Sequence, residues 1–416
     1  MAADDSTSIP LTAMGCRWIL DLTHLPVAAV KEMRRRWSRC EELDADPATI
    51  ALDEDRVPVV PVPAHRFGEL QESDRHPPSP PVFVPYDDHR LHALPYDLSR
   101  ALTRRGITRL TGRALLLHAA ALTDAAGRAV VLVAPSGTGK STASATLGRH
   151  LGYVTDESVV ITWVGGEARL APYPKPPSLI PTRMGEAPTA QDKDERSPDD
   201  LGLAPTHPDP VVAAMVTLAR SDEADEPRLV EVDLLDQLQD LLPETSSVFA
   251  LPDGLEQLAR AATRSGPPLR LEYREIGDCL GLLRSLLQER ERPAPEWVHL
   301  PPRPGERLPP SSESGASWDE WPLTAGAVVR RLPWTDAIAH EGRVLVLLHH
   351  QPVLLAGLGE LVWTQTGTPR SVGELEALAV AAFGEHPESA RLVHDAVASL
   401  AARGLVVVDP EQGEGV

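Results

Sequence analysis

The chain has 416 residues, of which 42% are hydrophobic, so two or three domains with packed cores are expected. Its formal net charge of −20 at pH 7 argues against a nucleic-acid-binding protein, because such proteins carry basic patches. Three scattered cysteines argue against a disulfide framework or a zinc site, and the lack of a signal peptide or a membrane-spanning apolar run predicts a cytoplasmic protein that is not embedded in a membrane.

Residues 1–108 are predicted to form an accessory α/β region. Its expected elements are a short strand that starts at Arg17 and helices over 24–40 and 94–104. The segments 58–63 and 77–85 are rich in proline, which cannot donate a hydrogen bond to a neighbouring strand, so central strands are not expected there. No pattern in this region indicates its role.

The central domain is predicted to span residues 109–291 and to contain a phosphate-binding loop (P-loop). The apolar run 129–133 predicts a buried strand, and a helix is expected over 140–151. Between them the sequence Ala-Pro-Ser-Gly-Thr-Gly-Lys-Ser matches the P-loop pattern Gly-x₄-Gly-Lys-Ser/Thr, except that Ala134 stands at the first glycine. The strand before the loop and the helix after it are the context that this motif requires. The alternative is an ordinary glycine-rich turn.

The P-loop is expected to bind ATP together with Mg²⁺. Its backbone amides and the positive end of the following helix would face the phosphates, and its glycines allow the close approach. Lys140 would contact the β- and γ-phosphates, and Ser141 would hold the Mg²⁺ ion. The predicted nucleotide-binding residues are Ser136, Gly137, Thr138, Gly139, Lys140, Ser141 and Thr142.

The adjacent acidic residues Asp156 and Glu157 are the candidates for the remaining chemistry. They follow the P-loop helix and lie between two apolar segments of the stretch 152–163. Asp156 could accept the proton of an acceptor hydroxyl, and Glu157 could reach the metal. The alternative for both is a solvated turn or a helix cap.

Other polar residues could line the same site. His118 lies on the strand expected over 114–122, and it could be a catalytic residue near the γ-phosphate or a core histidine with satisfied nitrogens. Lys175 and Arg220 could neutralise phosphate charge, although a surface position is expected for each.

The rest of the central domain is predicted to contain further strands and helices. The expected strands cover 211–219 and 269–275, and the expected helices cover 233–242, 255–263 and 276–288. Residues 186–209 are polar and rich in proline and aspartate, which favours a mobile loop that could act as a lid. A proline-rich linker over 292–321 then marks a domain boundary.

The last domain is predicted to span residues 322–410 and to be a small winged-helix-like module. Ser371 and Glu374 form a capping box at the start of one helix. An apolar stripe from Leu392 to Leu400 indicates the next helix, and a strand is expected directly after it.

The central motifs resemble the HPr kinase/phosphorylase family. The resemblance lies in His118, the loop 134–141 and the sequence Tyr-Val-Thr-Asp-Glu that ends at Glu157. Members of that family phosphorylate a serine of a carrier protein, and relatives in lasso-peptide gene clusters phosphorylate peptides. The resemblance implies an oligomeric, ATP- and Mg²⁺-dependent kinase. The roles that it implies are base for Asp156, Mg²⁺ ligands for Glu157 and Ser141, phosphate binding for Lys140 and a place at the site for His118.

The chain also departs from that family. Ala134 replaces the usual glycine, the acidic pair is Asp-Glu rather than Asp-Asp, and the second signature loop, which is important for phosphorolysis, is not found. The sequence therefore favours kinase activity over phosphorolysis. P-loop phosphoenolpyruvate carboxykinases share the same core, so the fold alone does not fix the reaction.

The last domain resembles the PqqD family of small modules that bind leader peptides of ribosomally made natural products. The matching segments are 361–363, 371–375 and 400–405. The resemblance implies a groove that adds a peptide as an extra strand. The alternative is a structural cap on the kinase.

These observations together predict an α/β P-loop kinase that transfers the γ-phosphate of ATP to a hydroxyl, expected to be a serine, of a protein or peptide in a ribosomal-peptide pathway. One alternative is a nucleotide-gated binding protein without dedicated catalysis. Another is a small-molecule kinase or carboxykinase of the same fold, in which the last domain only packs.

Overall fold

The computed structural model of the chain describes residues 7–41, 54–62, 81–85, 94–135, 137–179, 194–288, 292–303 and 324–409. The chain divides into two compact units. The first unit comprises 1–233, 240–251 and 258–294, and the second comprises 234–239, 252–257 and 295–416. No helix among the described residues combines the length and apolar character needed to cross a membrane.

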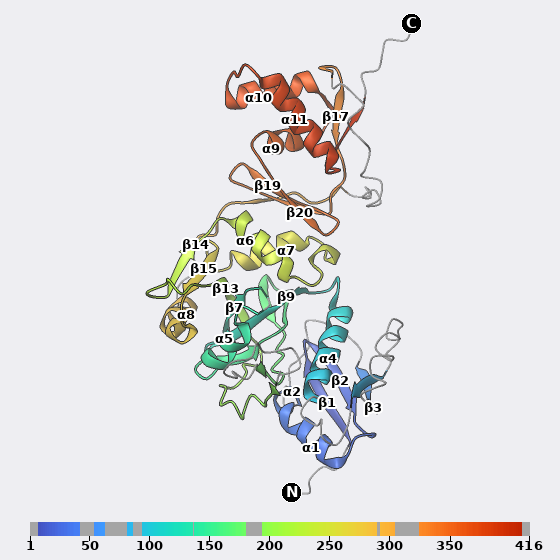
Figure 1. Cartoon of the computed structure of the whole chain (residues 1–416), viewed down its shortest axis with the longest axis vertical. Coiled ribbons are helices and arrows are strands. Elements are labelled where there is room, and N and C mark those ends of the chain that lie inside the picture. Colours follow the sequence, from blue (N-terminus) through green and yellow to red (C-terminus); the bar gives the residue numbers. More distant parts are fainter. Residues whose placement is uncertain are drawn as a thin grey trace. The chain divides into compact units, whose positions relative to one another are not determined.

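The first unit begins with a small sheet that is covered by helices (Figure 1). Its strands, in the order β1-β2-β3-β4, are β1 (Ser8–Ala13), β2 (Cys16–Asp21), β3 (Asp55–Val62) and β4 (Val82–Pro85). The accompanying helices are α1 (Val27–Arg36), α2 (Ser38–Glu41) and α4 (Leu94–Leu110). Their apolar side chains form one core with residues of the central region, among them Leu116, Val160 and Tyr173. The described part of residues 1–108 therefore packs as part of the P-loop unit.

The expectation for the proline-rich segment 58–63 is wrong. Strand β3 contains Pro58 and Pro61, yet it lies between β2 and β4. The register explains this. β2 pairs with β3 only as far as Pro58, and β4 pairs with β3 only from Val59 onward. Each proline therefore has a neighbouring strand on one side only. In this respect it resembles a residue of an edge strand, where a missing N–H is tolerated. Of the other segment, 77–85, the described part is the edge strand β4, and 77–80 lie outside the described residues.

The central sheet carries the P-loop. Its main path is β5-β9-β10-β13-β7-β6-β8, and β15 extends it by pairing with β13 and with β14. The strands are β5 (Leu115–Leu117), β6 (Ala119–Thr123), β7 (Arg128–Val133), β8 (Gly152–Thr155), β9 (Val159–Val164), β10 (Glu167–Leu170), β13 (Val211–Arg220), β14 (Arg228–Glu231) and β15 (Leu269–Tyr273). The buried run of β7 and the predicted strands at 211–219 and 269–275 are confirmed.

The single strand expected over 114–122 is two strands, β5 and β6, separated by His118. The amide of His118 donates to the carbonyl oxygen of Glu244, at 2.6 Å, instead of to the sheet. The two pieces then pair with different neighbours, β5 with β9 and β6 with β7 and β8.

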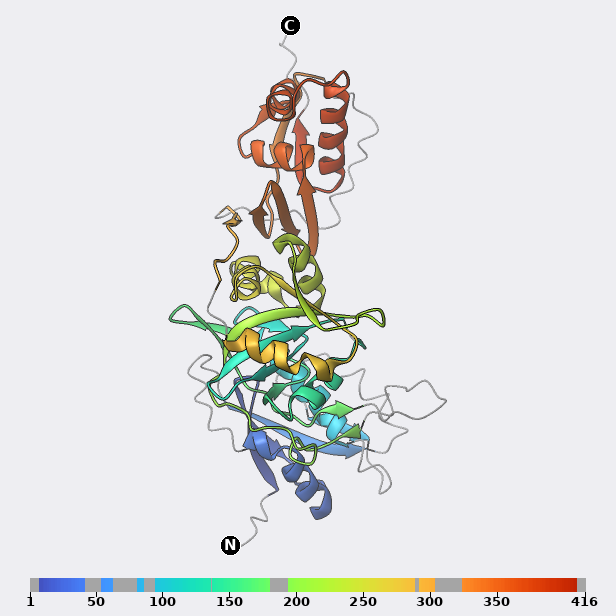
Figure 2. The same cartoon turned by 90° about the vertical axis from the view of Figure 1, so that its left-hand side faces the viewer.

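Two helices, α5 (Lys140–Leu147) and α8 (Leu280–Gln288), pack against strands of this sheet. Helices α6 (Leu234–Leu241) and α7 (Gly254–Ala262) each contribute residues to both units, and short 3₁₀ turns lie at Leu242–Glu244, Val248–Ala250 and Ile276–Cys279. Helix α8, drawn in gold, lies across β7 and β13 (Figure 2). The side chains of α5 and α8 share a buried apolar core with those strands, which fixes the helix that follows the P-loop.

The interpretation of 186–209 as a mobile loop is wrong for the part that the structure describes. Two short strands, β11 (Ser178–Leu179) and β12 (Asp194–Glu195), pair with each other. Glu195, Ser197 and Leu203 are buried. Residues 180–193 lie outside the described residues.

The second unit has its own core. One sheet has the order β16-β18-β19-β20, formed by β16 (Val298–His299), β18 (Asp336–His340), β19 (Arg343–Leu348) and β20 (Gln351–Ala356). A second has the order β21-β17-β22, formed by β21 (Arg370–Ser371), β17 (Val328–Arg331) and β22 (Val406–Asp409). Helices α9 (Leu358–Gln365), α10 (Val372–Phe383) and α11 (Ser389–Ala402) complete it.

Two details of the second unit bear on the sequence predictions. The capping box is confirmed, because Ser371 Oγ accepts the amide of Glu374 and the Glu374 carboxylate accepts the amide of Ser371. Strand β16 lies within the stretch expected to be linker, since Val298 and His299 pair with β18. Residues 304–323 of that stretch lie outside the described residues.

Candidate active site at one edge of the central sheet

The topology brings the P-loop, His118 and the acidic pair to one edge of the central sheet. Strands β7 and β8 both run antiparallel to β6. Their carboxyl ends therefore meet where β6 begins: Val133 pairs with Ala119, and Thr155 pairs with Ala121. The P-loop follows β7, Asp156 follows β8, and His118 directly precedes β6.

The P-loop needs its two glycines for their backbone angles. Gly137 and Gly139 have φ angles of 84° and 103°, in the left-handed region that side chains disfavour. A Cβ atom at either position would meet no other atom within 4 Å, so the requirement is conformational rather than steric. Ser136, one of the predicted binding residues, lies outside the described residues. Gly137, Thr138 and Thr142 are exposed, and Gly139 and Ser141 are half-buried.

Lys140 lies at the first position of α5, and its side chain is only 5% exposed. Its ammonium group donates a hydrogen bond to the carbonyl oxygen of Ala134 and lies 3.8 Å from the Glu244 carboxylate. Burial lowers the pKa of Lys140, and the nearby Glu244 offsets this only in part. The sequence analysis missed Glu244, which follows α6 and belongs to no recognisable motif.

The residues at the start of α5 suit a magnesium ion. Ser141 is the second residue of the helix, and within the described part of the chain its hydroxyl has no hydrogen-bonding partner. Hydroxyl and carboxylate oxygens are hard ligands of the kind that Mg²⁺ binds, usually with several waters retained. The donor set of Ser141 and Glu157 therefore fits Mg²⁺.

The two acidic residues differ in their surroundings. Asp156 is 3% exposed, and its Oδ1 accepts a hydrogen bond from the Tyr153 hydroxyl at 2.9 Å. Glu157 has a side chain that is 30% exposed, and its carbonyl oxygen lies 3.0 Å from His118 Nδ1. The half-buried His118 thus contacts the backbone of the acidic pair. Asp156 is enclosed, whereas Glu157 can reach a solvent-exposed ion.

The surface position expected for Lys175 is wrong. The segment after β10 runs back beside β8, where the amide of Tyr173 donates to the carbonyl oxygen of Val154 at 3.0 Å. This brings the fully buried Lys175 next to the acidic pair. Its ammonium lies 3.1 Å from Asp156 Oδ1 and 3.2 Å from Glu157 Oε2.

A third carboxylate, that of Glu195, lies 3.9 Å from the Lys175 ammonium. Burial alone would lower the pKa of Lys175, but the carboxylates of Asp156, Glu157 and Glu195 together raise it well above its ordinary value. Burial raises the pKa of Glu195 to about 7, and the attraction of Lys175 compensates only partly. Sequence reasoning missed Glu195 because no local pattern links it to the site.

Arg220, by contrast, has the surface position expected for it. Its side chain is 57% exposed and lies 3.6 Å from the Glu275 carboxylate. Its guanidinium also donates to the carbonyl oxygen of Arg274, at 3.1 Å. These contacts occupy it at the surface, and we give it no role in the site.

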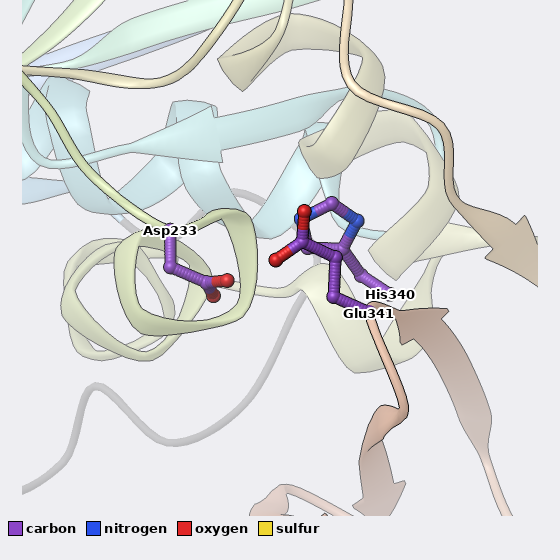
Figure 3. Close-up of side chains that lie close together, drawn as sticks. All are labelled: Asp233, His340 and Glu341. Carbon is purple, nitrogen blue, oxygen red and sulfur yellow. The ribbon is translucent and has the colours of Figure 1, made fainter.

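Titratable side chains outside this edge are shown in Figure 3. His340 and Glu341 lie at the turn between β18 and β19, in the second unit. His340 Nδ1 lies 2.7 Å from the carbonyl oxygen of Glu296. Asp233, which directly precedes α6, belongs to the first unit. Because these residues belong to separate units, we assign them to no common site.

No family model matches the sequence, and no curated protein matches it. Among solved structures, the chain is similar to the Hpr(Ser) kinase/phosphatase from Coxiella burnetii. The two sequences are 13% identical, and the TM-score is 0.23. The match covers 42% of this chain and 93% of that chain. At this TM-score the likeness carries no conclusion about activity.

Proposed function

We propose that the chain is an ATP-dependent kinase that transfers the γ-phosphate to a hydroxyl of a protein or peptide. One observation carries the proposal: the P-loop and the enclosed Asp156 lie at the carboxyl ends of two strands that flank β6. In phosphoryl transfer a phosphate-holding loop must lie next to a group that orients or deprotonates the acceptor. The common sheet edge supports that arrangement.

Each proposed role follows from the surroundings of the residue. Lys140 would exchange the Ala134 carbonyl for phosphate oxygens, which are better partners for an ammonium group. The amides at the start of α5 lack intrahelical partners and would face the phosphates. Ser141 and Glu157 would hold Mg²⁺, which when bound neutralises charge on the β- and γ-phosphates.

The proposed reaction balances simply. The acceptor oxygen forms a bond to the γ-phosphorus as the bond from that phosphorus to the β,γ-bridging oxygen breaks, and ADP leaves. The proton of the acceptor hydroxyl passes to the Asp156 carboxylate. Because Asp156 is 3% exposed, bulk water would compete little for that proton.

We further propose that the second unit presents the acceptor. Two sheets and three helices of its described residues enclose a core that includes Trp363, Val393 and Leu400. The PqqD resemblance in its sequence makes a peptide the proposed cargo. A strand at the edge of its sheet, β20, has β19 on one side, and an extended peptide could pair with the other side.

A nucleotide-gated binding protein is the second candidate. The observation that favours it is the engagement of Asp156, whose Oδ1 already contacts both the Tyr153 hydroxyl and the Lys175 ammonium. A carboxylate held in this way can also be purely structural. In that case nucleotide binding would change how the protein binds a peptide or partner, and no phosphate would be transferred.

Incubation of the full chain with γ-labelled Mg-ATP and candidate peptides or proteins distinguishes the two. The kinase proposal predicts ADP formation and labelled acceptor for the wild type, and loss of both in Asp156→Asn. Asp200→Asn, an exposed aspartate in the same unit, is the matched control and should retain both. Bound nucleotide without ADP formation, over all acceptors tested, would support the binding protein instead.

A further inference from the structure

We propose that Lys175 is the positioning residue of the Asp156–Glu157 pair and that the N-terminal region holds it in place through Glu195 and Ser99. The inference rests on the proposed function of the acidic pair. It also gives residues 1–108 a role that no sequence pattern indicates.

Lys175 joins the two carboxylates of the pair. Its ammonium lies 3.1 Å from Asp156 Oδ1 and 3.2 Å from Glu157 Oε2, so one cation bridges two neighbouring residues of the turn after β8. Two adjacent carboxylates repel each other and would separate without it. The bridge therefore restrains the side chains of both Asp156 and Glu157.

Lys175 cannot itself be the group that binds the nucleotide. Its side chain is 1% exposed, and its ammonium also donates to the carbonyl oxygen of Pro176 at 3.1 Å. With carboxylates on its other sides it has no direction left for a phosphate. A fully buried ammonium is stable only with such partners. Its effect on the reaction must therefore pass through Asp156 and Glu157.

Glu195 forms the next layer. Its carboxylate lies 3.9 Å from the Lys175 ammonium, and each of its oxygens accepts a hydrogen bond from a serine hydroxyl. Ser178 donates to Oε1 and Ser99 donates to Oε2, both at 2.7 Å. Both oxygens are thereby fixed, so the glutamate stays within reach of the Lys175 ammonium.

The outermost contacts come from the N-terminal region. Ser99 lies on α4, and Arg36 of α1 donates to the carbonyl oxygen of Glu195. The helices of residues 1–108 thus hold β12 against the central sheet at the point where Glu195 meets Lys175. A chain of contacts runs from Ser99 through Glu195 and Lys175 to Asp156.

The charges of the cluster favour the same role. The carboxylates of Asp156 and Glu157 share one ammonium, so negative charge remains after pairing whether or not Glu195 is protonated. Glu157 is the exposed member, with 30% of its side chain accessible. The excess negative charge is therefore available to a cation that binds Glu157. Lys175 would keep the Glu157 carboxylate in place for that cation.

The test compares three variants of the full chain with the wild type: Lys175→Met, Ser99→Ala and the control Asp200→Asn. The control breaks an exposed contact between Asp200 and Arg35 of α1, which also joins the N-terminal region to the segment after β12. For each protein, kcat and the KM for Mg-ATP are measured for ADP formation in the presence of the candidate peptide and protein acceptors, together with the melting temperature.

We expect Lys175→Met to lower kcat by about 100-fold or more, the size of a general-base contribution, with KM unchanged. KM should hold because the P-loop, and not Lys175, contacts the nucleotide. Ser99→Ala should lower kcat in the same direction by a smaller factor, and Asp200→Asn should leave it unchanged. If Lys175→Met does not fold, Ser99→Ala alone tests the inference. A lower kcat with an unchanged KM in that variant would support the positioning role.

Two results would overturn the inference, and they are distinguishable. An active wild type whose kcat survives in both Lys175→Met and Ser99→Ala, or whose kcat and KM change together with the melting temperature, removes the positioning role alone. If the wild type forms no ADP with any acceptor tested, the proposed function is contradicted, and the positioning role is contradicted with it.

Discussion

The ammonium of Lys140 lies 3.8 Å from the carboxylate of Glu244. The same glutamate accepts the amide of His118 through its carbonyl oxygen. One residue after α6 therefore contacts both the lysine of the P-loop and the break between β5 and β6. Any anion that binds Lys140 must compete with this carboxylate.

The variant Glu244→Gln should bind ATP more tightly than the wild type. Its amide removes a negative charge that attracts Lys140 and repels phosphate, an effect of about 1 kcal/mol or more at such a distance, or roughly fivefold in affinity. Calorimetric titration with Mg-ATP measures this. Glu275→Gln, an exposed glutamate paired with Arg220, is the control. Weaker binding by Glu244→Gln would mean that the glutamate helps to bind the nucleotide.

The variant Asp156→Asn should lose catalysis and keep nucleotide binding. The amide can still accept the hydrogen bond from Tyr153, but it cannot take up a proton. A fall in the rate of ADP formation of about 100- to 10,000-fold is expected, the usual range for a lost general base. Turnover near the wild-type rate would show that Asp156 is not the base.

The variant Glu195→Gln should change how stability depends on pH. The pKa of Glu195 is about 7 in the folded chain and 4.5 in the ordinary state, so the folded chain keeps this proton to higher pH. The free energy of unfolding therefore falls as the pH rises through this window.

The variant lacks this carboxyl group and should not show that fall. Its free energy of unfolding, relative to that of the wild type, should therefore rise by about 2 kcal/mol from pH 5 to pH 8. Urea unfolding of both proteins at the two pH values measures the difference. A difference that stays constant with pH would mean that Glu195 is ionised throughout.

The variant Ser371→Ala should destabilise the second unit. Its hydroxyl accepts the amide of Glu374, and alanine would leave that amide without its acceptor. The expected loss is about 1 kcal/mol. Thermal unfolding of the full chain measures it, and Ser371→Asp, which can cap the helix equally well, is the matched control. Equal effects of alanine and aspartate would rule out the cap as the cause.

Several members of the candidate site could be picked out from local patterns. The apolar run of β7, the glycines of the loop and the first turn of α5 are neighbours in sequence, so their pattern is visible without the fold. The same holds for Asp156 and Glu157, which directly follow one short strand, and for the capping box of α10.

Long-range contacts could not be predicted in this way. Lys175, Glu195 and Glu244 come from separate segments, and only the pairing of β11 with β12 and the return of 171–173 beside β8 bring the first two to the acidic pair. The low strand propensity of proline gave the wrong prediction at β3 for a related reason. Its prolines are tolerated because of a register that two other strands determine.

The most direct test of the central claim is thermal unfolding with and without Mg-ATP, for the wild type, Lys140→Ala and the exposed-lysine control Lys31→Ala. Ligand at about one hundred times its dissociation constant stabilises a folded protein by about 2.7 kcal/mol. We predict a clear rise in melting temperature for the wild type and Lys31→Ala, and none for Lys140→Ala. No rise in the wild type, or an equal rise in Lys140→Ala, would contradict nucleotide binding at the P-loop.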